Sequence, residues 1–460
     1  MHQGRGEWLM RPLSHTRIDL TALHGRHPQR YPACLESVAH NARTGRYSIL
    51  FAFPEATLWL DRQGRSWRGD ALLPDTTHFL GELDRQLLAP APAEPCPLPF
   101  CGGHFVYLGY EFLQQIEDIR IPPADGALPV AFALPARGAI VLDHVAGQGH
   151  LVASGPDAAA LLEQMAADLA ALERTPGYAP VRLLELQEDP ESWFLDGVQR
   201  IQEYIRAGDV FQVNLSRAWQ ARVAGECAPL ALYQQLRLHN PAPFAGFFQW
   251  RDSYVLSSSP ERLLQRDGGL LQSRPIAGTR PRHPHQDAAM ARELLAHPKE
   301  RAEHIMLIDL IRNDLGRVCR PGSIAVDELM VIESYRHVHH IVSNVYGAPR
   351  AEATPGQMLA ALFPGGTITG CPKVRCMEII GELERVGRGP YTGSMGYVSV
   401  DGKMDFNILI RSMQYHQDTL RLRAGAGIVA DSVPARELEE TRAKAAGLLR
   451  ALGAGHDRSA

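Results

Sequence analysis

The sequence predicts a globular protein in which sheets and amphipathic helices are combined. Short apolar runs separated by turns fill the first third of the chain, as expected for strands. In the second half, helical patterns that open with proline alternate with strand patterns. The 460 residues are 45% hydrophobic and 21% charged, which is typical of a soluble protein with a large core. Length alone suggests about three domains, or fewer if the sheets are large.

Composition excludes several classes of function. The formal net charge of -4, without a lysine- or arginine-rich run, gives no basic footprint for nucleic acid. The first 15 residues lack the apolar core of a signal peptide, and no apolar run approaches membrane-spanning length, which favours the cytoplasm. The seven cysteines lack paired CxxC motifs or histidine partners for zinc, so we expect them to be reduced. Partners are expected to be small molecules or proteins.

The N-terminal third has the pattern of a sheet. From Ile18 to about Trp67, apolar runs alternate with turns and end in DRQGRSW, which predicts a hairpin. Residues 88–99 are rich in proline and alanine and suggest a surface connection. Two further strand patterns follow, GGHFVYLGYEF and AFALPARGAIVLDH. A helix is predicted over about 157–172, and RTPGYAPVRLLELQEDP leads to the second half.

The second half opens with a helix and a strand behind it. Asp189 is predicted to cap the helix, Pro190 to start it and Gly208 to end it. The apolar residues of one helix face are Phe194, Val198, Ile201 and Ile205. In the strand, alternation puts one set of side chains on one side and a polar pair on the other. The first set is Phe211, Val213 and Leu215, and the polar pair is Gln212 and Asn214. A solvated strand residue is the alternative interpretation of Gln212.

Two later strands carry loops that suggest function. SYVLSSSPERLL and GGLLQSRPIAGTRPR predict the strands, and Glu261 follows Pro260 in the first loop. A single loop carboxylate is more often a surface group than a catalytic acid, so Glu261 needs support from other residues.

Carboxylates recur on one face of each of two helices. Pro298 begins a helix with Glu300 and Glu303 one turn apart. Pro434 begins another whose polar stripe consists of Glu437, Glu440, Thr441 and Lys444. If the helices face each other, their four carboxylates form an oxygen-rich pocket suited to Mg2+. The alternative is two solvated helix faces.

A glycine-rich turn enters a helix within FPGGTITGCPKVRCMEIIGELE, residues 363–384. Unpaired N–H groups at the start of this helix favour an anion site, and an ordinary tight turn is the alternative. Core positions on the helix are predicted to be Val374, Met377, Ile380 and Leu383. The turn is not a phosphate-binding P-loop, because Gly370 is followed by Cys371 and Pro372. AGAGIVA is not a dinucleotide fingerprint either, because DSVP interrupts the helix that should follow.

These motifs together resemble the chorismate-utilising enzymes, most densely from Asp189 to Leu449. They occur in family order as GDVFQVNLS, SSSPER, SRPIAGTRPR, RAEHIMLIDLIRNDLGRV, HHIVS, the glycine-rich stretch and RAGAGIVADSVPARELEET. The resemblance implies an α+β fold, with a large antiparallel β-sandwich body and helices packed outside. It divides the chain into an N-terminal anthranilate synthase component I-like region, 1–180, and a chorismate-binding catalytic region, 188–452, within one body.

The resemblance also implies roles for the acidic residues. Glu303 and Glu440 resemble the direct ligands of Mg2+, with Glu300 and Glu437 supporting through water. The metal would hold the ring carboxylate of chorismate. Glu261 resembles the general acid that protonates the departing C4 hydroxyl.

The remaining site residues resemble those that surround the substrate. His340 in HHIVS corresponds to a histidine near C2, with Thr367 beside it in the glycine turn. The predicted grip on the carboxylates and the enolpyruvyl arm consists of Tyr391, Arg411, Gly425, Gly427 and Lys444.

The nucleophile distinguishes members of the family. Water-adding members carry a lysine base where this chain has Gln212, and an amide cannot deprotonate water, so ammonia is the implied reagent. Ala277 stands where the best known aminodeoxychorismate synthases carry a covalent lysine, and PIAGT is usual in anthranilate synthase. QVNLS, HHIVS, FPGGTITG and YSILFAFP instead resemble aminodeoxychorismate synthase. We therefore predict component I of that enzyme, with anthranilate synthase component I as the alternative.

Two further expectations concern partners and regulation. The chain lacks the GxCxG nucleophile elbow of a glutamine amidotransferase, so a separate glutaminase subunit is implied. CLES resembles a tryptophan-binding motif, which makes Leu35, Glu36 and Ser37 a candidate regulatory tryptophan site. A hypothesis of another class is a non-catalytic subunit that senses chorismate or tryptophan, and Ala277 is its only support.

Overall fold

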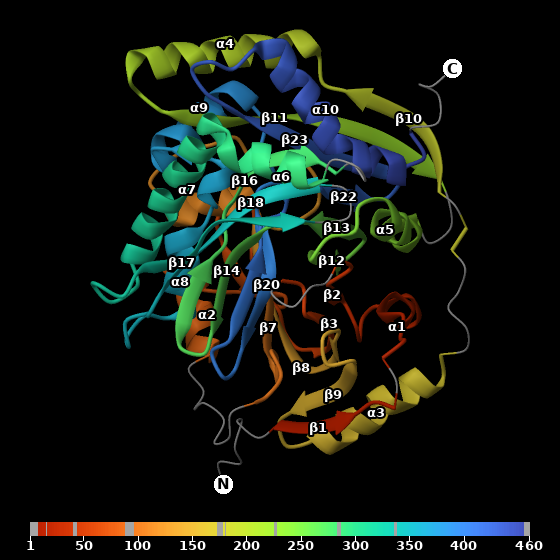
Figure 1. Cartoon of the computed structure of the whole chain (residues 1–460). Helices are drawn as coiled ribbons and strands as arrows, with labels where there is room; N and C mark the ends of the chain where they lie inside the picture. Colours follow the sequence, from red (N-terminus) through yellow and green to blue (C-terminus); the bar gives the residue numbers. More distant parts are fainter. Residues whose placement is uncertain are drawn as a thin grey trace.

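Helices surround a continuous network of strands in the computed structural model of the chain (Figure 1). The structure describes residues 8–14, 16–39, 44–87, 96–172, 178–179, 181–224, 228–282, 287–334 and 338–454. Its helices are α1 (Leu20–Arg26), α2 (Phe79–Leu87), η1 (Tyr110–Gln115), α3 (Ala158–Ala170), α4 (Glu191–Ala207), α5 (Ala228–His239), α6 (Asp287–Ala296), α7 (Pro298–Gly316), α8 (Pro355–Leu362), η2 (Gly366–Ile368), α9 (Lys373–Glu384) and α10 (Pro434–Ala451). None of the helices in these ranges is both long and apolar enough to cross a membrane.

One path of strands crosses the molecule through antiparallel pairs. In order of pairing it consists of β1 (Trp8–Pro12), β9 (Gln148–Ser154), β8 (Ala131–Asp143), β3 (Tyr47–Pro54), β2 (Ala33–Glu36), β12 (Phe244–Trp250), β13 (Ser253–Ser259), β22 (Ser412–His416), β23 (Thr419–Ile428), β11 (Gln212–Ala224) and β10 (Arg182–Glu188). The short β19 (Gly370–Cys371) pairs with the first residues of β11.

A second path also starts at β8. It runs through β7 (Gly103–Leu108), β20 (Ser394–Ser399), β21 (Met404–Asn407), β14 (Arg262–Asp267), β15 (Leu270–Ser273), β18 (Val338–Gly347) and β17 (Ala325–Ser334). Strand β16 (Ile276–Pro281) pairs with β18, and a small ribbon of β4 (Leu58–Leu60), β5 (Ser66–Arg68) and β6 (Ala71–Leu72) extends from β8. The predicted α+β class, with large antiparallel sheets and outer helices, is confirmed.

Strands from the two predicted regions pair with each other. The N-terminal β2 pairs with β12, and β7 pairs with β20. In Figure 1 the red and orange elements of the N-terminal third accordingly continue into the green and blue strands. This agrees with the expectation of one body, while the boundary between residues 180 and 188 stays a prediction.

The predicted alternation in β11 holds for the strand but fails at its entrance. Val213 and Leu215 enter the core against Phe194 and other apolar residues of α4. The prediction for Phe211 was wrong, because its side chain is 69% exposed. Its backbone N–H donates to the Cys371 carbonyl at 2.8 Å, just before the strand begins. Gln212 and Asn214 are buried on the opposite face, which excludes a solvated Gln212.

The capping prediction for α4 was right at one end and wrong at the other. Gly208 ends the helix with φ 85°. Asp189 does not cap the start: Pro190 is the N-cap, and the Asp189 carboxylate accepts from the Ala218 N–H of β11 at 2.7 Å. The local pattern suited a cap, but the neighbouring strand offered this carboxylate a donor.

Other predicted elements are present with small shifts. The predicted helix over 157–172 is α3, the DRQGRSW hairpin joins β4 to β5, and AGAGI lies inside β23. In α9, Met377 and Ile380 are buried as predicted, whereas Val374 is 40% exposed. Most of the predicted connection over 88–99 lies outside the described residues, which resume at 96.

Candidate active site

The candidate site lies where β11 and β23 meet the first turns of α7 and α10. Both helices begin with proline, as predicted. Helix α10 packs against β23, and α7 packs against β16, β18 and η2. An ion pair between Lys299 and Asp431, 3.1 Å long, joins the start of α7 to the turn before α10. The first turns of the two glutamate-bearing helices are therefore near each other.

Glu303 on α7 is one of the four predicted metal ligands and is hydrogen-bonded to β11. Its Oε1 accepts from Gln212 Nε2 at 2.9 Å. Burial raises the pKa of the Glu303 carboxyl, and the negative charges of Glu300 and Glu440 raise it further, while Gln212 and Lys444 oppose them. The charge of Glu440 on α10 therefore reaches Glu303 on α7.

The α10 carboxylates are more exposed. Glu440 Oε1 lies 2.7 Å from Lys444 Nζ on the same helix. Burial raises the pKa of Glu437, the Ser432 hydroxyl lowers it, and Glu440 raises it again. Lysine 444 is also held by the Gly425 carbonyl, which accepts from Nζ at 3.0 Å.

The donor chemistry fits a hard divalent cation. The four glutamates supply only oxygen atoms, which Mg2+ prefers. The charges of Glu300 and Glu440 disfavour ionisation of Glu303, and a cation between the helices would relieve that repulsion. Across the described ranges, however, no three His, Cys, Asp or Glu side chains are gathered closely enough to hold an ion. The metal assignment therefore stays a prediction. In this structure the Glu440 carboxylate is paired with the Lys444 ammonium.

Glu261 has the environment of a buried acid. It lies between β13 and β14, is 5% exposed, and its Oε1 accepts from Thr367 Oγ1 at 2.7 Å. Burial raises the pKa of Glu261 to about 7, against the opposing effects of the Thr367 hydroxyl and the Lys444 charge. A carboxyl with this pKa is substantially protonated at neutral pH and can donate a proton.

His340 on β18 is neutral at physiological pH, because burial lowers its pKa to about 4. Its Nδ1 lies 3.2 Å from the Gly278 carbonyl, so the neutral ring donates there and leaves Nε2 unprotonated. Gly278 has φ 65°, and a Cβ at this position would meet the Glu300 carboxylate. The neighbouring Ala277 is buried, pairs with Ile341 and offers no nucleophile.

Two side-chain amides of β11 lie across two glycines of β23. A Cβ at Gly427 would approach Gln212 Nε2 closer than real Cβ atoms do, and one at Gly425 would lie 2.7 Å from Asn214 Oδ1. The Tyr391 hydroxyl lies 2.9 Å from the same Gly425 position. The AGAG pattern therefore makes room for amide and phenol groups.

Tyr391 and Arg411 supply donors for an anionic ligand. Burial raises the pKa of Tyr391 to about 12, so its hydroxyl stays protonated. Burial lowers the pKa of Arg411 to about 10, which keeps the guanidinium charged at neutral pH. Arg411 has φ 54° and donates to the Lys444 carbonyl, which ties this loop to α10. Together with the Lys444 ammonium, these groups suit a dianion.

The predicted catalytic, substrate and metal residues are thus coupled to one another. Lys444 lowers the pKa of both Glu261 and Glu303, while the charge of Arg411 lowers that of His340. The predicted anion site at the start of α9 stays a prediction.

The candidate tryptophan residues lie elsewhere, at β2 and just after it. Glu36 accepts from the Tyr233 hydroxyl and pairs with Arg237, both at 2.9 Å. The Ser37 hydroxyl donates to the Tyr47 carbonyl at 2.8 Å, and Leu35 is partly buried. Internal partners therefore hold the polar groups of this motif, and tryptophan binding stays a prediction.

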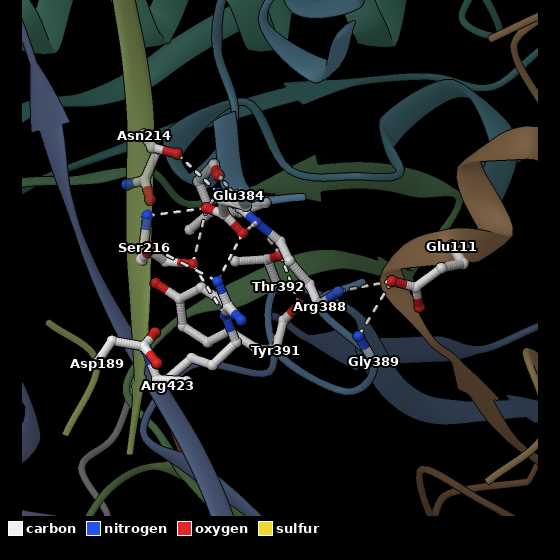
Figure 2. Close-up of polar contacts among 12 residues, drawn as sticks. Glu111, Asp189, Asn214, Ser216, Glu384, Arg388, Gly389, Tyr391, Thr392 and Arg423 are labelled. Atoms are coloured by element: carbon white, nitrogen blue, oxygen red, sulfur yellow. Dashed lines mark hydrogen bonds and ion pairs between the residues drawn. The ribbon is translucent and has the colours of Figure 1, made fainter. Parts of the chain in front are cut away.

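The sequence motifs did not predict a buried charge network that lies next to Tyr391 (Figure 2). Glu384 pairs with Arg388 at 2.7 Å and with Arg423 at 2.8 Å, and accepts from both the backbone N–H and the hydroxyl of Ser216. Arg388 also donates to the Asn214 carbonyl at 2.7 Å. The i,i+4 spacing of Glu384 and Arg388 was a local signal, but Arg423 is distant in sequence.

The network extends into the N-terminal region through Glu111 of η1. Its Oε1 accepts from the backbone N–H of Arg388 at 2.7 Å and of Gly389 at 3.1 Å (Figure 2). Burial raises the pKa of Glu111 to about 7. The loop that carries Tyr391 is therefore fixed from both regions of the chain.

Comparisons with known proteins identify the family of this chain. The family model described as chorismate binding enzyme matches residues 36–450. Anthranilate synthase component 1 of Thermus thermophilus is 40% identical over 430 residues, 91% of each chain. Aminodeoxychorismate synthase component 1 of Bacillus subtilis is 41% identical over 368 residues, 77% of each chain. The crystal structure of anthranilate synthase component I from Streptococcus pneumoniae matches with a TM-score of 0.79 and 30% identity, over 89% of this chain and 93% of that chain.

Proposed function

This chain belongs to the family of chorismate binding enzymes, and from that premise we propose that it aminates chorismate. The product is 4-amino-4-deoxychorismate, a precursor of p-aminobenzoate and folate, and the chain acts as component I of an aminodeoxychorismate synthase. The proposal depends most on two residues of the site, the Gln212 amide and the buried acid Glu261. Gln212 offers no base to activate water, while Glu261, whose pKa is about 7, can protonate a leaving hydroxyl.

The proposed role of each site residue follows from its charge. Tyr391, Arg411 and Lys444 hold the carboxylates of the substrate, and the neutral His340 borders the ring. Glu261 delivers its proton to the C4 oxygen as the C4–O bond breaks, and Thr367 aims that carboxyl.

Magnesium would be held by Glu303 and Glu440, with Glu300 and Glu437 supporting through water. When bound, it neutralises the ring carboxylate and the charge that develops as the hydroxyl leaves.

Ammonia is proposed to come from a separate glutamine amidotransferase subunit, as the word "component" in the names of relatives suggests. The isolated chain should then use ammonium salts and not glutamine. Because Ala277 supplies no covalent nucleophile, free ammonia adds at C2 in its place, and a second ammonia then adds at C4 while the C2 group leaves.

The second candidate is anthranilate formation. Ala277 favours it, because PIAGT is usual in anthranilate synthases, and relatives with that name match most of the chain. The polar Asn214 of QVNLS and the HHIVS and FPGGTITG motifs favour the first candidate.

A product assay decides between them. Purified chain is incubated with chorismate, ammonium and Mg2+, with and without aminodeoxychorismate lyase. We expect p-aminobenzoate only when the lyase is added. Anthranilate fluorescence without lyase would reject the first candidate in favour of the second. No turnover at saturating ammonium would favour the non-catalytic sensor.

A further inference from the structure

Asn214 has a buried side-chain amide oxygen that no described group satisfies. The residue is 9% exposed, and within the part of the chain that the structure describes its Oδ1 has no hydrogen-bond partner. A buried amide oxygen left without a donor loses its hydrogen bond to water and gains none in return. A ligand that supplies an N–H or O–H group would remove this cost.

The backbone of Asn214 is fully engaged, in contrast to its side chain. Its N–H donates to the Thr369 carbonyl at 2.9 Å. Its carbonyl accepts from Arg388 at 2.7 Å, as Figure 2 shows. These backbone hydrogen bonds therefore fix the Cα position from which the Asn214 side chain extends. From there the side chain extends over Gly425, which the Tyr391 hydroxyl and the Lys444 ammonium also approach. The unsatisfied acceptor thus lies among the predicted substrate contacts.

The chemistry of the reactants limits what this oxygen can bind. Both carboxylates of chorismate are acceptors at neutral pH, and its hydroxyl at C4 is the group assigned to Glu261. Ammonia brings three N–H donors. A neutral amide accepts one of them without favouring protonation, whereas a carboxylate would stabilise ammonium, which has no lone pair for attack.

Resting on the proposed function, we propose that Asn214 positions the ammonia nucleophile through its Oδ1. In a first displacement ammonia adds at C2, the ring double bonds shift and the C4–O bond breaks. In a second displacement the ammonia held by Asn214 adds at C4, the double bonds shift back and the C2 substituent leaves as ammonia. The hydroxyl leaves as water with the proton of Glu261, and the new ammonium group returns one proton to the Glu261 carboxylate. Asn214 accepts an N–H hydrogen bond throughout and gives up no atom.

The test separates ammonium from chorismate in steady-state kinetics. Asn214→Leu replaces the amide with a group of similar shape, and Asn214→Ala removes the acceptor without adding bulk. Loss of one hydrogen bond of about 1.4 kcal/mol corresponds to a tenfold change. We expect both variants to raise KM for ammonium about tenfold while KM for chorismate stays within twofold.

A matched control is Asn344→Leu in β18. The Asn344 amide donates to Gln272 at 3.1 Å and to Asp327 at 3.0 Å, so its replacement should lower stability and leave KM for ammonium unchanged. If Asn214→Leu does not fold, Asn214→Ala alone decides.

Three outcomes are distinguishable. No ammonium-dependent turnover in the wild type rejects the proposed function and this inference with it. Normal wild-type turnover with an unchanged ammonium KM in a folded Asn214 variant rejects the inference alone. A raised KM for chorismate with an unchanged KM for ammonium also rejects it, because Asn214 would then contact chorismate.

Discussion

The glutamates of the site differ in burial, and their pKa values differ accordingly. Glu261 is enclosed and has a pKa of about 7, whereas Glu440 lies on the exposed side of α10 against Lys444. Glu303 is between these extremes, half-buried and paired with an amide. The same side chain can therefore serve as a proton donor in one place and as a metal ligand in another.

The raised pKa of Glu261 predicts how activity depends on pH. As pH rises through about 7, the carboxyl loses the proton that it must donate, so kcat/KM for chorismate should fall. The measurement is a pH profile in which the concentration of free NH3 is held constant, because ammonium itself titrates. Glu261→Gln should lower kcat by about 100-fold or more and abolish this limb of the profile. A limb that persists in the variant would mean that another group donates the proton.

Glu303 provides the test of the metal site. Glu303→Gln keeps the shape of the side chain and removes the charge, so we expect Mg2+-dependent turnover to be lost while the fold survives. Removal of Mg2+ from the wild type with a chelator should have the same effect. Circular dichroism and the unfolding midpoint check the fold. Undiminished activity of the variant would show that the assignment of Glu303 is wrong.

At the scale of elements, the decisive feature is the pairing of β11 with β23. Asn214 pairs with Gly427 and Ser216 with Gly425, so the amides of one strand lie over the glycines of the other. Side chains at these glycines would displace the groups that face the substrate.

Gly427→Ala should reduce activity more than stability. The new methyl meets the Gln212 amide, the end of a flexible side chain that can move away from Glu303. We expect kcat/KM to fall about tenfold or more, with the free energy of unfolding changed by less than about 1 kcal/mol.

The matched control is Gly316→Ala at the end of α7. A Cβ there meets nothing closer than 3.9 Å, so this change should leave activity intact and raise stability by up to about 1 kcal/mol. Equal activity of the two variants would contradict the role given to the glycine.

At the scale of the whole molecule, the Glu384 network connects parts that are distant in sequence. Glu384 ends α9, Arg423 lies in β23, and Ser216 lies in β11. Two arginines share one buried carboxylate, which keeps the pKa of Glu384 below its usual value despite its burial.

Glu384→Gln should be strongly destabilising. The variant leaves Arg388 and Arg423 without their counter-charge, a loss of about 3–5 kcal/mol for a broken buried pair. Urea unfolding measures this. The control is Glu382→Gln, because Glu382 is exposed and accepts from the Tyr204 hydroxyl, and its change should stay within about 0.5 kcal/mol. Similar losses in both variants would show that the network adds little.

Sequence motifs identified candidate site residues, but not the buried contacts that support them. Gln212, Glu261 and Glu303 could be found because their types suit the chemistry and their motifs occur in family order. The ion pair between Glu384 and Arg423 could not be predicted from the sequence, because it depends on the pairing of strands that are distant in the chain.

Local capping rules likewise failed at Asp189, because its carboxylate accepts a hydrogen bond from the neighbouring strand β11 instead of capping α4. Periodicity identified α3, α7 and α10, since an apolar or polar stripe on a helix is a local property.

The pairings of β2 with β12 and of β7 with β20 also bear on how the protein is made. A ribosome releases the first 180 residues well before the partner strands at 244–250 and 394–399 have emerged. During that interval the nascent sheet has two bare edges, and exposed edges are templates for association with other chains. Protection of these edges during synthesis is therefore part of obtaining an intact enzyme.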